Sequence, residues 1–177
     1  VIFDSKRAQE WADNLKETRL LHWITDDAYI SYNHIGLPLI IKDRDFLISN
    51  QMEFDKESKT FWFRSKSISQ SEFESLAPSQ TLAAKANAVR GQILSGSFAI
   101  KEIGPDKSHV RATLQCDPMG QIPKWLVNTI QKTWPFAMFK GLRQQAGKSN
   151  VSIDPAIEKI VDFKTESAVI IVDHDAN

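Results

Sequence analysis

The sequence predicts an α+β domain in which a curved antiparallel sheet wraps around one long C-terminal helix. From about residue 20 to residue 116, short stretches of alternating apolar and polar residues follow one another, as in antiparallel strands. Turn residues such as Asp26-Asp27 and Gly104-Pro105 separate these stretches. The strongly apolar residues 123–146 then predict a helix that a sheet, a ligand or a membrane must cover.

The N-terminal part is predicted to contain a helix followed by two strands. Residues 6–17 place Trp11 and Leu15 on one helical face together with two alanines, which predicts an amphipathic helix. Residues 20–25 and 28–34 alternate apolar with polar side chains on either side of a turn. They are therefore expected to form the first two strands.

The central part is predicted to add strands to the same sheet. A hairpin is expected at residues 44–54 and 60–69, and residues 70–87 are expected to form a loop with one helical turn. Residues 88–103 are predicted to be one long strand that bends at its glycines. Residues 107–116 are predicted to be the strand that leads into the long helix.

The end of the long helix is the predicted boundary between a domain and a C-terminal extension. The long helix at 123–146 ends the predicted domain, residues 1–146, and residues 147–177 are an extension of unknown role. Within it, residues 154–161 predict a short helix. Two interpretations stay open for the apolar run at 168–172: a strand, or a tail packed on a neighbour.

Composition excludes several classes of protein. Lysine plus arginine equals aspartate plus glutamate at 22 each, and this zero net charge argues against a general nucleic-acid binder. The single Cys116 excludes an internal disulfide framework. No apolar run reaches the ~18 residues of a membrane span, and no signal peptide is visible. The compartment stays open, with the cytoplasm favoured over secretion.

No catalytic or metal-binding motif is present in the sequence. The four histidines are scattered and none pairs with another at the spacing of a helical metal site. Asp173-His174-Asp175 is best explained as a solvated tail. No Gly-x-Ser-x-Gly elbow exists, and Gly91–Gly96 lacks the Gly-Lys-Ser/Thr of a phosphate-binding loop. The sequence thus predicts a protein that is not an enzyme and uses no metal or cofactor.

Two features of the sequence predict a ligand site. One is the set of charged residues at the start of apolar strands, and the other is the broadest part of the apolar stripe on the long helix. Two interpretations stay open for Arg44, Asp45 and Arg90. They form ion pairs at the edge of the sheet, or they hold a ligand head group inside an apolar cavity. The apolar wall of that cavity is predicted to come from one broad stripe of the helix: Trp125, Ile130, Trp134, Met138 and Phe139.

Three segments of the sequence resemble the StAR-related lipid-transfer (START) domain. Their order and spacing agree with the family across about residues 1–146, and the third is the most specific. The segments are Arg44-Asp45-Phe46 after a proline-containing loop, Val89-Arg90-Gly91, and Asp117-Pro118-x-Gly120-x-Ile122-Pro123-x-Trp125-Leu126-Val127-Asn128 before a helix that ends near Leu142-Arg143.

The resemblance implies a helix-grip fold, in which the sheet grips the last helix and one lipid lies in a tunnel between them. It also implies that this helix and the loop before Arg44 form a gate that meets membranes. The residues alone favour a loop folded onto the core, so the resemblance reverses that interpretation. The predicted gate residues are Ile35, Leu37, Pro38, Leu39 and Ile40.

The sequence also departs from the family's pattern. The family has a further helix and about two strands before the position of Val1. Sterol-binding members carry an arginine six residues after the arginine of Arg-Asp-Phe, where this chain has Asn50, and its acidic partner is absent from residues 29–33. A sterol bound in that manner is therefore not expected.

The predicted function is to carry or sense one hydrophobic ligand, a lipid, with a membrane surface as a transient partner and no nucleic acid. Two alternatives stay open. The first is a helix-grip enzyme, a cyclase or hydrolase, which needs His22, His109 or a carboxylate inside the cavity. The second is a regulatory module that binds lipid without transferring it and uses residues 148–177 as a partner surface.

Overall fold

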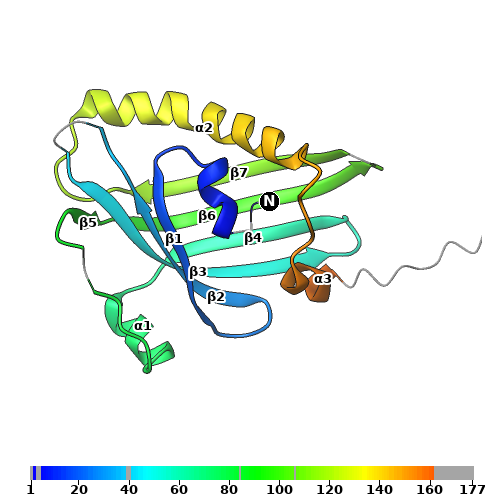
Figure 1. Cartoon of the computed structure of the whole chain (residues 1–177), viewed down its shortest axis with the longest axis horizontal. Helices are drawn as coiled ribbons and strands as arrows, with labels where there is room; N and C mark the ends of the chain where they lie inside the picture. Colours follow the sequence, from blue (N-terminus) through cyan, green and yellow to red (C-terminus); the bar gives the residue numbers. More distant parts are fainter. Residues whose placement is uncertain (1, 3–4, 39–40, 84, 106, 162–177) are drawn as a thin grey trace, which may run out of the picture.

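The computed structural model describes residues 2, 5–38, 41–83, 85–105 and 107–161. It confirms the predicted α+β helix-grip fold: seven strands form one sheet, and a long helix lies over it (Figure 1). The strands are β1 (Leu15–Trp23), β2 (Ala28–Ile35), β3 (Asp43–Asp55), β4 (Thr60–Ser67), β5 (Ala88–Arg90), β6 (Gln92–Gly104) and β7 (Lys107–Asp117), and the helices are η1 (Ser5–Glu10, a 3-10 helix), α1 (Gln70–Leu76), α2 (Lys124–Ala146) and α3 (Pro155–Val161).

The sheet order is β1-β2-β3-β4-β6-β7, and its pairings along this path are antiparallel. One face, the α1 face, packs Ile30, Tyr32 and Leu47 against Phe73 of α1. The opposite face, the α2 face, is covered by η1 and α2, whose buried side chains form a second core cluster: Ala8, Trp11, Met138 and Leu142. The sheet therefore has a hydrophobic core on each side.

The predicted helix at residues 6–17 is wrong beyond its first turns. Only Ser5–Glu10 is helical, Asn14 adopts a left-handed φ of 65°, and β1 begins at Leu15. Trp11 is nevertheless buried, at 9% exposure, as an amphipathic pattern requires. Pairing with β2 satisfies the backbone of residues 15–23, so long-range hydrogen bonding overrides the local helical pattern.

The predicted long strand at residues 88–103 is interrupted at Gly91. β5 leaves β6 there and pairs in parallel with β3, and the Gly91 N–H donates to the Asp45 carbonyl at 2.9 Å. A Cβ at position 91 would lie 2.4 Å from the ring of Phe46, which is itself buried. Glycine thus permits the close approach of the two strands.

The predicted C-terminal helices are confirmed at 124–146 and 155–161. Helix α2 passes so close to η1 that a Cβ at Gly141 would lie 2.3 Å from the Trp11 carbonyl oxygen. Asp154 caps α3, because its carboxylate accepts the Ala156 N–H at 2.9 Å. The apolar run at 168–172 lies outside the described residues.

Candidate functional site

The α2 face of the sheet is the surface on which a ligand held under α2 would rest. Asn50 of β3 pairs with Tyr29 of β2 and with Ser65 of β4, so these three side chains point to the same face. Phe98 lies two residues beyond the partner of Ser65 and packs against the cluster that contains Met138 of α2. The shared face is therefore the one beneath α2.

An aromatic row crosses this face from β1 to β6. The ring centroids of Trp23 and Tyr29 are 5.1 Å apart, those of Tyr29 and Phe63 are 6.3 Å apart, and those of Phe63 and Phe98 are 6.5 Å apart. All three pairs are tilted, as aromatic side chains prefer. The row gives the face a continuous apolar surface suited to acyl chains or rings.

A neutral polar cluster, here called the polar floor, lies beside the aromatic row. The Asn50 amide nitrogen donates to the Ser31 hydroxyl at 2.8 Å, and the Ser65 hydroxyl donates to the Asn50 amide oxygen at 2.8 Å. Asn50 is 3% exposed and Ser31 is 8% exposed. The polar floor thus offers amide and hydroxyl groups without a formal charge.

The sequence did not identify the polar floor as a site. Its signal was the alternation of Tyr29, Ser31 and Asn33 along β2, which places small polar groups on one face. Because the partners of these residues lie on other strands, only the strand register brings Ser31, Asn50 and Ser65 together.

Helix α2 divides the predicted wall residues between its two sides. Met138 is 3% exposed and Trp134 packs against its cluster, while Ile130 is half-buried on the same side of the helix. Trp125 and Phe139 instead lie toward solvent, at 57% and 36% exposure. Of the predicted wall residues, Ile130, Trp134 and Met138 are therefore the ones that α2 directs toward the sheet.

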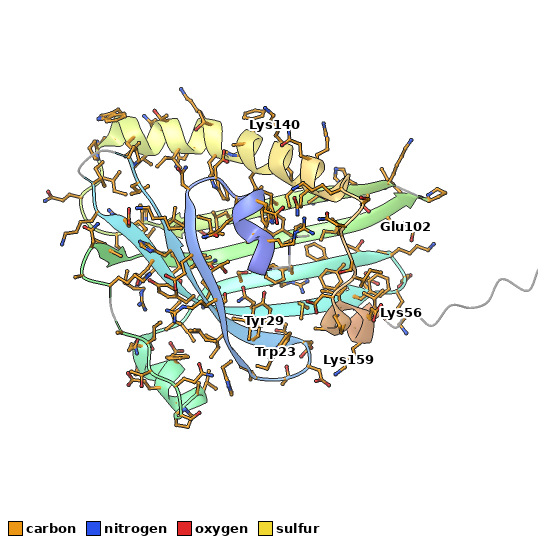
Figure 2. All side chains as sticks on the ribbon, in the orientation of Figure 1. Trp23, Tyr29, Lys56, Glu102, Lys140 and Lys159 are labelled. Atoms are coloured by element: carbon orange, nitrogen blue, oxygen red, sulfur yellow. The ribbon has the colours of Figure 1, made fainter. Side chains whose placement is uncertain are left out.

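The exposed side of α2 is both aromatic and basic. Phe136 is 78% exposed and joins Trp125 and Phe139 at helical spacing. The whole helix contains no acidic residue, and its four basic side chains are exposed, with Lys140 pointing away from the sheet in Figure 2. Within the described part of the chain, no helix is long and apolar enough to cross a bilayer. The basic residues are Lys124, Lys132, Lys140 and Arg143.

Arg44 holds the loop that precedes α2. Its guanidinium donates to the carbonyls of Pro118 at 2.5 Å and Met119 at 2.9 Å, and to those of Lys42 at 2.5 Å and Asp43 at 3.2 Å. Arg44 is 3% exposed, and burial lowers the pKa of its guanidinium from the ordinary value. The strand-to-helix loop is thus tied to β3.

Asp45 and Arg90 pair with each other on the α1 side of the sheet. Arg90 donates to the two Asp45 oxygens at 2.8 and 3.2 Å, and the Tyr32 hydroxyl donates to Asp45 at 3.2 Å. Leu47, two residues beyond Asp45, packs against α1. These contacts place the pair opposite the polar floor.

The predicted gate loop is anchored at Asp43. This buried carboxylate accepts the Leu37 N–H at 3.2 Å and contacts Lys16 and His34 at 2.9 Å each. Burial alone would raise the pKa of Asp43, but the hydrogen bonds from Lys16 and Leu37 lower it below the ordinary value. Ile35 ends β2 and Pro38 is exposed, whereas Leu39 and Ile40 lie outside the described residues.

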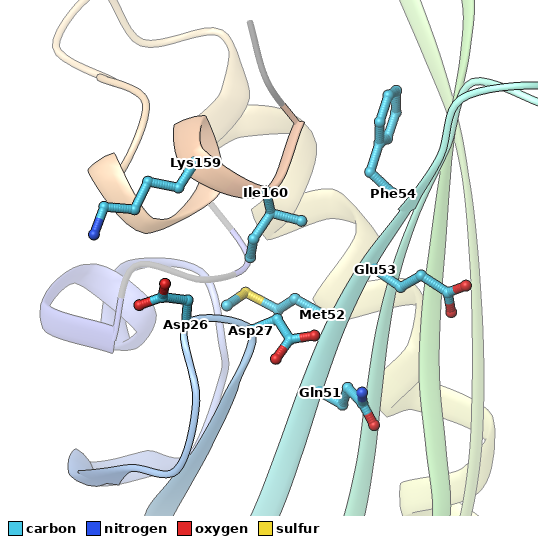
Figure 3. Close-up of a pocket in the computed structure, with 8 residues that line it drawn as sticks. All are labelled: Asp26, Asp27, Gln51, Met52, Glu53, Phe54, Lys159 and Ile160. Atoms are coloured by element: carbon cyan, nitrogen blue, oxygen red, sulfur yellow. The ribbon is translucent and has the colours of Figure 1, made fainter.

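Two surface hollows mark the ends of the sheet. One, of about 550 Å³, lies between α3 and the end of β3, where Met52, Phe54 and Ile160 meet Asp26 and Asp27 (Figure 3). The other, of about 700 Å³, lies between β4 and the β5–β6 corner beside Arg90. The polar floor lines neither hollow.

The residues proposed for an enzyme do not face α2. His22 pairs with Ile30, which belongs to the α1-face core, and His109 is three residues from Ala112 of the α2-face cluster. Partial burial and Asp117 raise the pKa of the Cys116 thiol to about 11, so it is protonated at neutral pH. Among the described residues, no group of three His, Cys, Asp or Glu side chains is placed to hold a metal ion.

Comparisons with known proteins agree on one family. The family model of the START domain matches residues 1–150. The crystal structure of human STARD10 aligns with a TM-score of 0.65 at 20% identity, covering 79% of this chain and 54% of that one. Human StAR-related lipid transfer protein 5 gives 0.61 at 18% identity, covering 79% and 62%. A fragment of a STAR-related lipid transfer protein from Xanthomonas axonopodis gives 0.62 at 19%, covering 83% and 76%.

The chain thus spans between half and two thirds of the two human structures. A comparison with curated protein sequences found no match. The structural neighbours share the fold, and the family model covers most of the chain, including the sheet and α2. The chain belongs to the START-domain family, whose model covers the sheet and α2.

Proposed function

We propose that the protein binds a single lipid between α2 and the sheet and exchanges it with membranes without catalysing a reaction. The observation that carries the proposal is the composition of the α2 face, where the aromatic row adjoins the polar floor. Burial of apolar ligand surface contributes about 25 cal/mol per Å², and the few polar groups select the ligand, because unpaired polar groups cost energy.

The polar floor favours a ligand whose buried polar group is uncharged. A charged head group placed beside Asn50, Ser31 and Ser65 would lack a counter-ion there, and burying an unpaired charge is costly. Arg44 and Arg90, the head-group residues predicted from sequence, already donate to protein oxygens. A hydroxyl, ester or amide group can exchange hydrogen bonds with the polar floor.

The direct test is native mass spectrometry of the protein purified from its own source, followed by lipid extraction. We expect one bound lipid per chain, with no formal charge on the part held at the polar floor. Protein that is consistently empty, and that takes up no lipid from mixed vesicles, would contradict the proposal.

The two tryptophans of α2 provide a matched test of the site. Trp134 packs toward the sheet, whereas Trp125 is 57% exposed on the other side of the helix. Trp134→Ala should therefore abolish binding of a fluorescent lipid, and Trp125→Ala should leave it within about twofold, because only the first removes cavity wall. Circular dichroism checks that both variants fold. If both folded variants bind the fluorescent lipid as well as the parent does, the ligand does not lie against the sheet-facing side of α2, and the proposed site is wrong.

Transfer is proposed to use the predicted gate loop and the exposed side of α2. An aromatic and basic helix side with no acidic residue suits the interface of an anionic bilayer. The double substitution Leu39→Asp and Ile40→Asp should slow lipid transfer between vesicles more than it weakens equilibrium binding. Equal transfer rates in variant and parent would reject the gate, and binding without any transfer would favour lipid sensing.

A further inference from the structure

The chain turns back after α2 and crosses the sheet a second time. Residues 148–161, here called the strap, run from the end of α2 to α3, which packs beside β3 (Figure 1). At its end, Ile160 and Lys159 line the hollow that also contains Met52 and Phe54 (Figure 3). The strap therefore covers the part of the α2 face that lies farthest from the gate loop.

The strap lies near the Trp23–Tyr29 end of the aromatic row, where Trp23 itself is 37% exposed. Tyr29 is only 6% exposed, and its ring lies 5.1 Å from Trp23 and 6.3 Å from Phe63, centre to centre. Burial, with a smaller contribution from Asp154 of the strap, raises the pKa of the Tyr29 phenol. Figure 2 shows Trp23 and Tyr29 on the side of the molecule where α3 and Lys159 lie. The other end of the row, at Phe98, is covered by α2.

The first half of the strap is held by contacts near the surface. Lys148 pairs with Glu10 of η1 at 2.8 Å, and Arg7 donates to the Asn150 carbonyl at 3.0 Å. The pKa of Glu10 falls to about 2 because Arg7 and Lys148 donate hydrogen bonds to its carboxylate. Because these groups reach solvent, salt screens their attraction, and they hold the strap only weakly.

The second half is held by little apolar burial. Helix α3 has seven residues, none of which is fully buried, and Ile157 and Ile160 are only half-buried. A helix this short is not stable by itself in water, so its structure depends on docking. By contrast, α2 places Leu126, Met138 and Leu142 almost completely out of solvent. The two covers of the aromatic row therefore differ greatly in how firmly they are held.

We propose that the strap is a displaceable cover of the lipid site, and that a lipid occupying the whole aromatic row competes with α3 for the Tyr29 end. This inference rests on the proposed function. The strap closes the row in the empty protein and moves aside when the lipid extends beneath it. Its departure exposes Tyr29 and Met52 to the ligand while α2 stays in place.

A reversible lock tests the competition. Met52 and Ile160 line the same hollow (Figure 3), so Met52→Cys with Ile160→Cys, in a Cys116→Ser background, places one thiol on the sheet and one on the strap. The strap is fixed in those molecules in which oxidation joins the two thiols as a disulfide. The oxidised protein should bind a fluorescent phosphatidylcholine at least tenfold more weakly than the same protein after reduction. Mass spectrometry confirms the bond. Affinities within twofold in the two redox states would overturn the proposal.

The opposite change loosens the strap. Ile160→Asp places a charge where α3 docks and should strengthen lipid binding about tenfold. This is the change expected if the closed strap is favoured about ten to one over the open strap and the substitution removes that preference. Ile103→Asp, at a side chain that is 61% exposed on β6, makes the same substitution away from the strap and should leave binding unchanged. Unchanged lipid binding in folded Ile160→Asp would show that the strap does not compete with the lipid, and weaker binding would show that it is a permanent wall of the site; either result would overturn the proposal.

Hydrogen exchange separates failure of this inference from failure of the proposed function. In the ligand-free protein, amides of residues 155–161 should exchange at least tenfold faster than those in the middle of α2, because a displaceable segment opens without global unfolding. If residues 155–161 and the middle of α2 exchange at the same rate, the strap is not displaceable, and the inference is overturned even if lipid binds. Fast exchange in a protein that binds no lipid from any vesicle would support the displaceable strap and count against the proposed function.

Discussion

At the scale of single residues, Asp43 shows how one buried carboxylate connects several segments. It accepts the Leu37 N–H and contacts Lys16 and His34, so it joins the predicted gate loop to β1 and β2. Replacing Asp43 with Asn keeps the shape but removes the charge. We expect a loss of about 2 kcal/mol in the free energy of unfolding at pH 7, as for hydrogen bonds to charged groups. Urea unfolding measures it.

The pH dependence of Asp43→Asn identifies the cause. The pKa of Asp43 is lower in the folded protein than the ~3.9 of the unfolded chain, so its stabilisation is complete above that value. It is lost as the pH falls through the lower folded value, and the gap between parent and variant should narrow below about pH 4. Glu53→Gln, which breaks the exposed pair with Arg64, should cost less than about 0.5 kcal/mol. If the difference in stability between the parent and Asp43→Asn does not change with pH, the charge of Asp43 does not contribute to stability.

Arg44 acts on the conformation of the loop before α2. Met119 and Gly120 in this loop both have left-handed φ angles, 52° and 64°, and Arg44 donates to the carbonyls of Pro118 and Met119. Replacing Arg44 with Met keeps the apolar stem but removes the donors. We expect the free energy of unfolding to fall by about 3 kcal/mol, because buried carbonyls lose charged partners.

The matched control for Arg44 is Arg64→Met, at an exposed arginine of β4. Because Arg64 pairs with Glu53 and lies 4.8 Å from the Trp62 ring centre at an exposed site, this substitution should lower the free energy of unfolding by no more than about 1 kcal/mol. Both variants are compared by guanidinium unfolding. Equal losses would show that Arg44 is not a special anchor of the α2 loop.

At the scale of elements, the contact between α2 and η1 depends on Gly141. A Cβ there would meet the backbone carbonyl oxygen of Trp11 at 2.3 Å, and the backbone cannot yield as a flexible side chain can. Gly141→Ala should therefore lower stability by about 1–3 kcal/mol through overpacking, even though alanine favours helices.

Gly147→Ala is the control at the end of the same helix. Its added Cβ would lie at ordinary contact distance, 3.7 Å, from the Arg143 carbonyl, and its φ is negative. We expect a change within about 1 kcal/mol in thermal unfolding. If Gly141→Ala is equally mild, η1 is free to move away from α2.

At the scale of the whole molecule, the chain has no net charge but distributes its charge unevenly. Helix α2 carries four basic residues and no acidic ones beside three exposed aromatic side chains. Lys132→Gln with Lys140→Gln should weaken binding to phosphatidylserine vesicles about thirty-fold, because each basic residue contributes about 1 kcal/mol at an anionic surface. Vesicle sedimentation at low salt measures the affinity.

Lys56→Gln with Lys66→Gln is the matched control, since it changes the net charge equally on another part of the surface. This control should reduce vesicle binding by no more than about twofold. High salt should also abolish the difference between the parent and the α2 variant, because salt screens exposed charges. Equal losses in both variants would show that net charge, and not the α2 surface, governs binding.

Local pattern predicted most elements because the turn residues and the apolar segments between them are visible in the sequence. The apolar stripe of α2 and the turns at Asp26-Asp27 and Gly104-Pro105 need no coordinates, whereas β2 and most of β3 are buried on both faces and show no alternation of burial. The first helix and the strand at 88–103 were predicted wrongly beyond residue 10 and across Gly91. In both places a distant strand, β2 or β3, takes up the backbone hydrogen bonds.

The sequence by itself determined the α+β class, the long closing helix and the family, because these depend on periodicity and on motifs that are contiguous along the chain. Only the tertiary structure decided which face each side chain occupies. It assembled Ser31, Asn50 and Ser65, paired Asp45 with Arg90 on the opposite face, and turned Trp125 outward and Trp134 inward. A shift of one residue in strand register reverses the face, and because β2 and most of β3 are buried on both faces, their apolar pattern does not show which face is which.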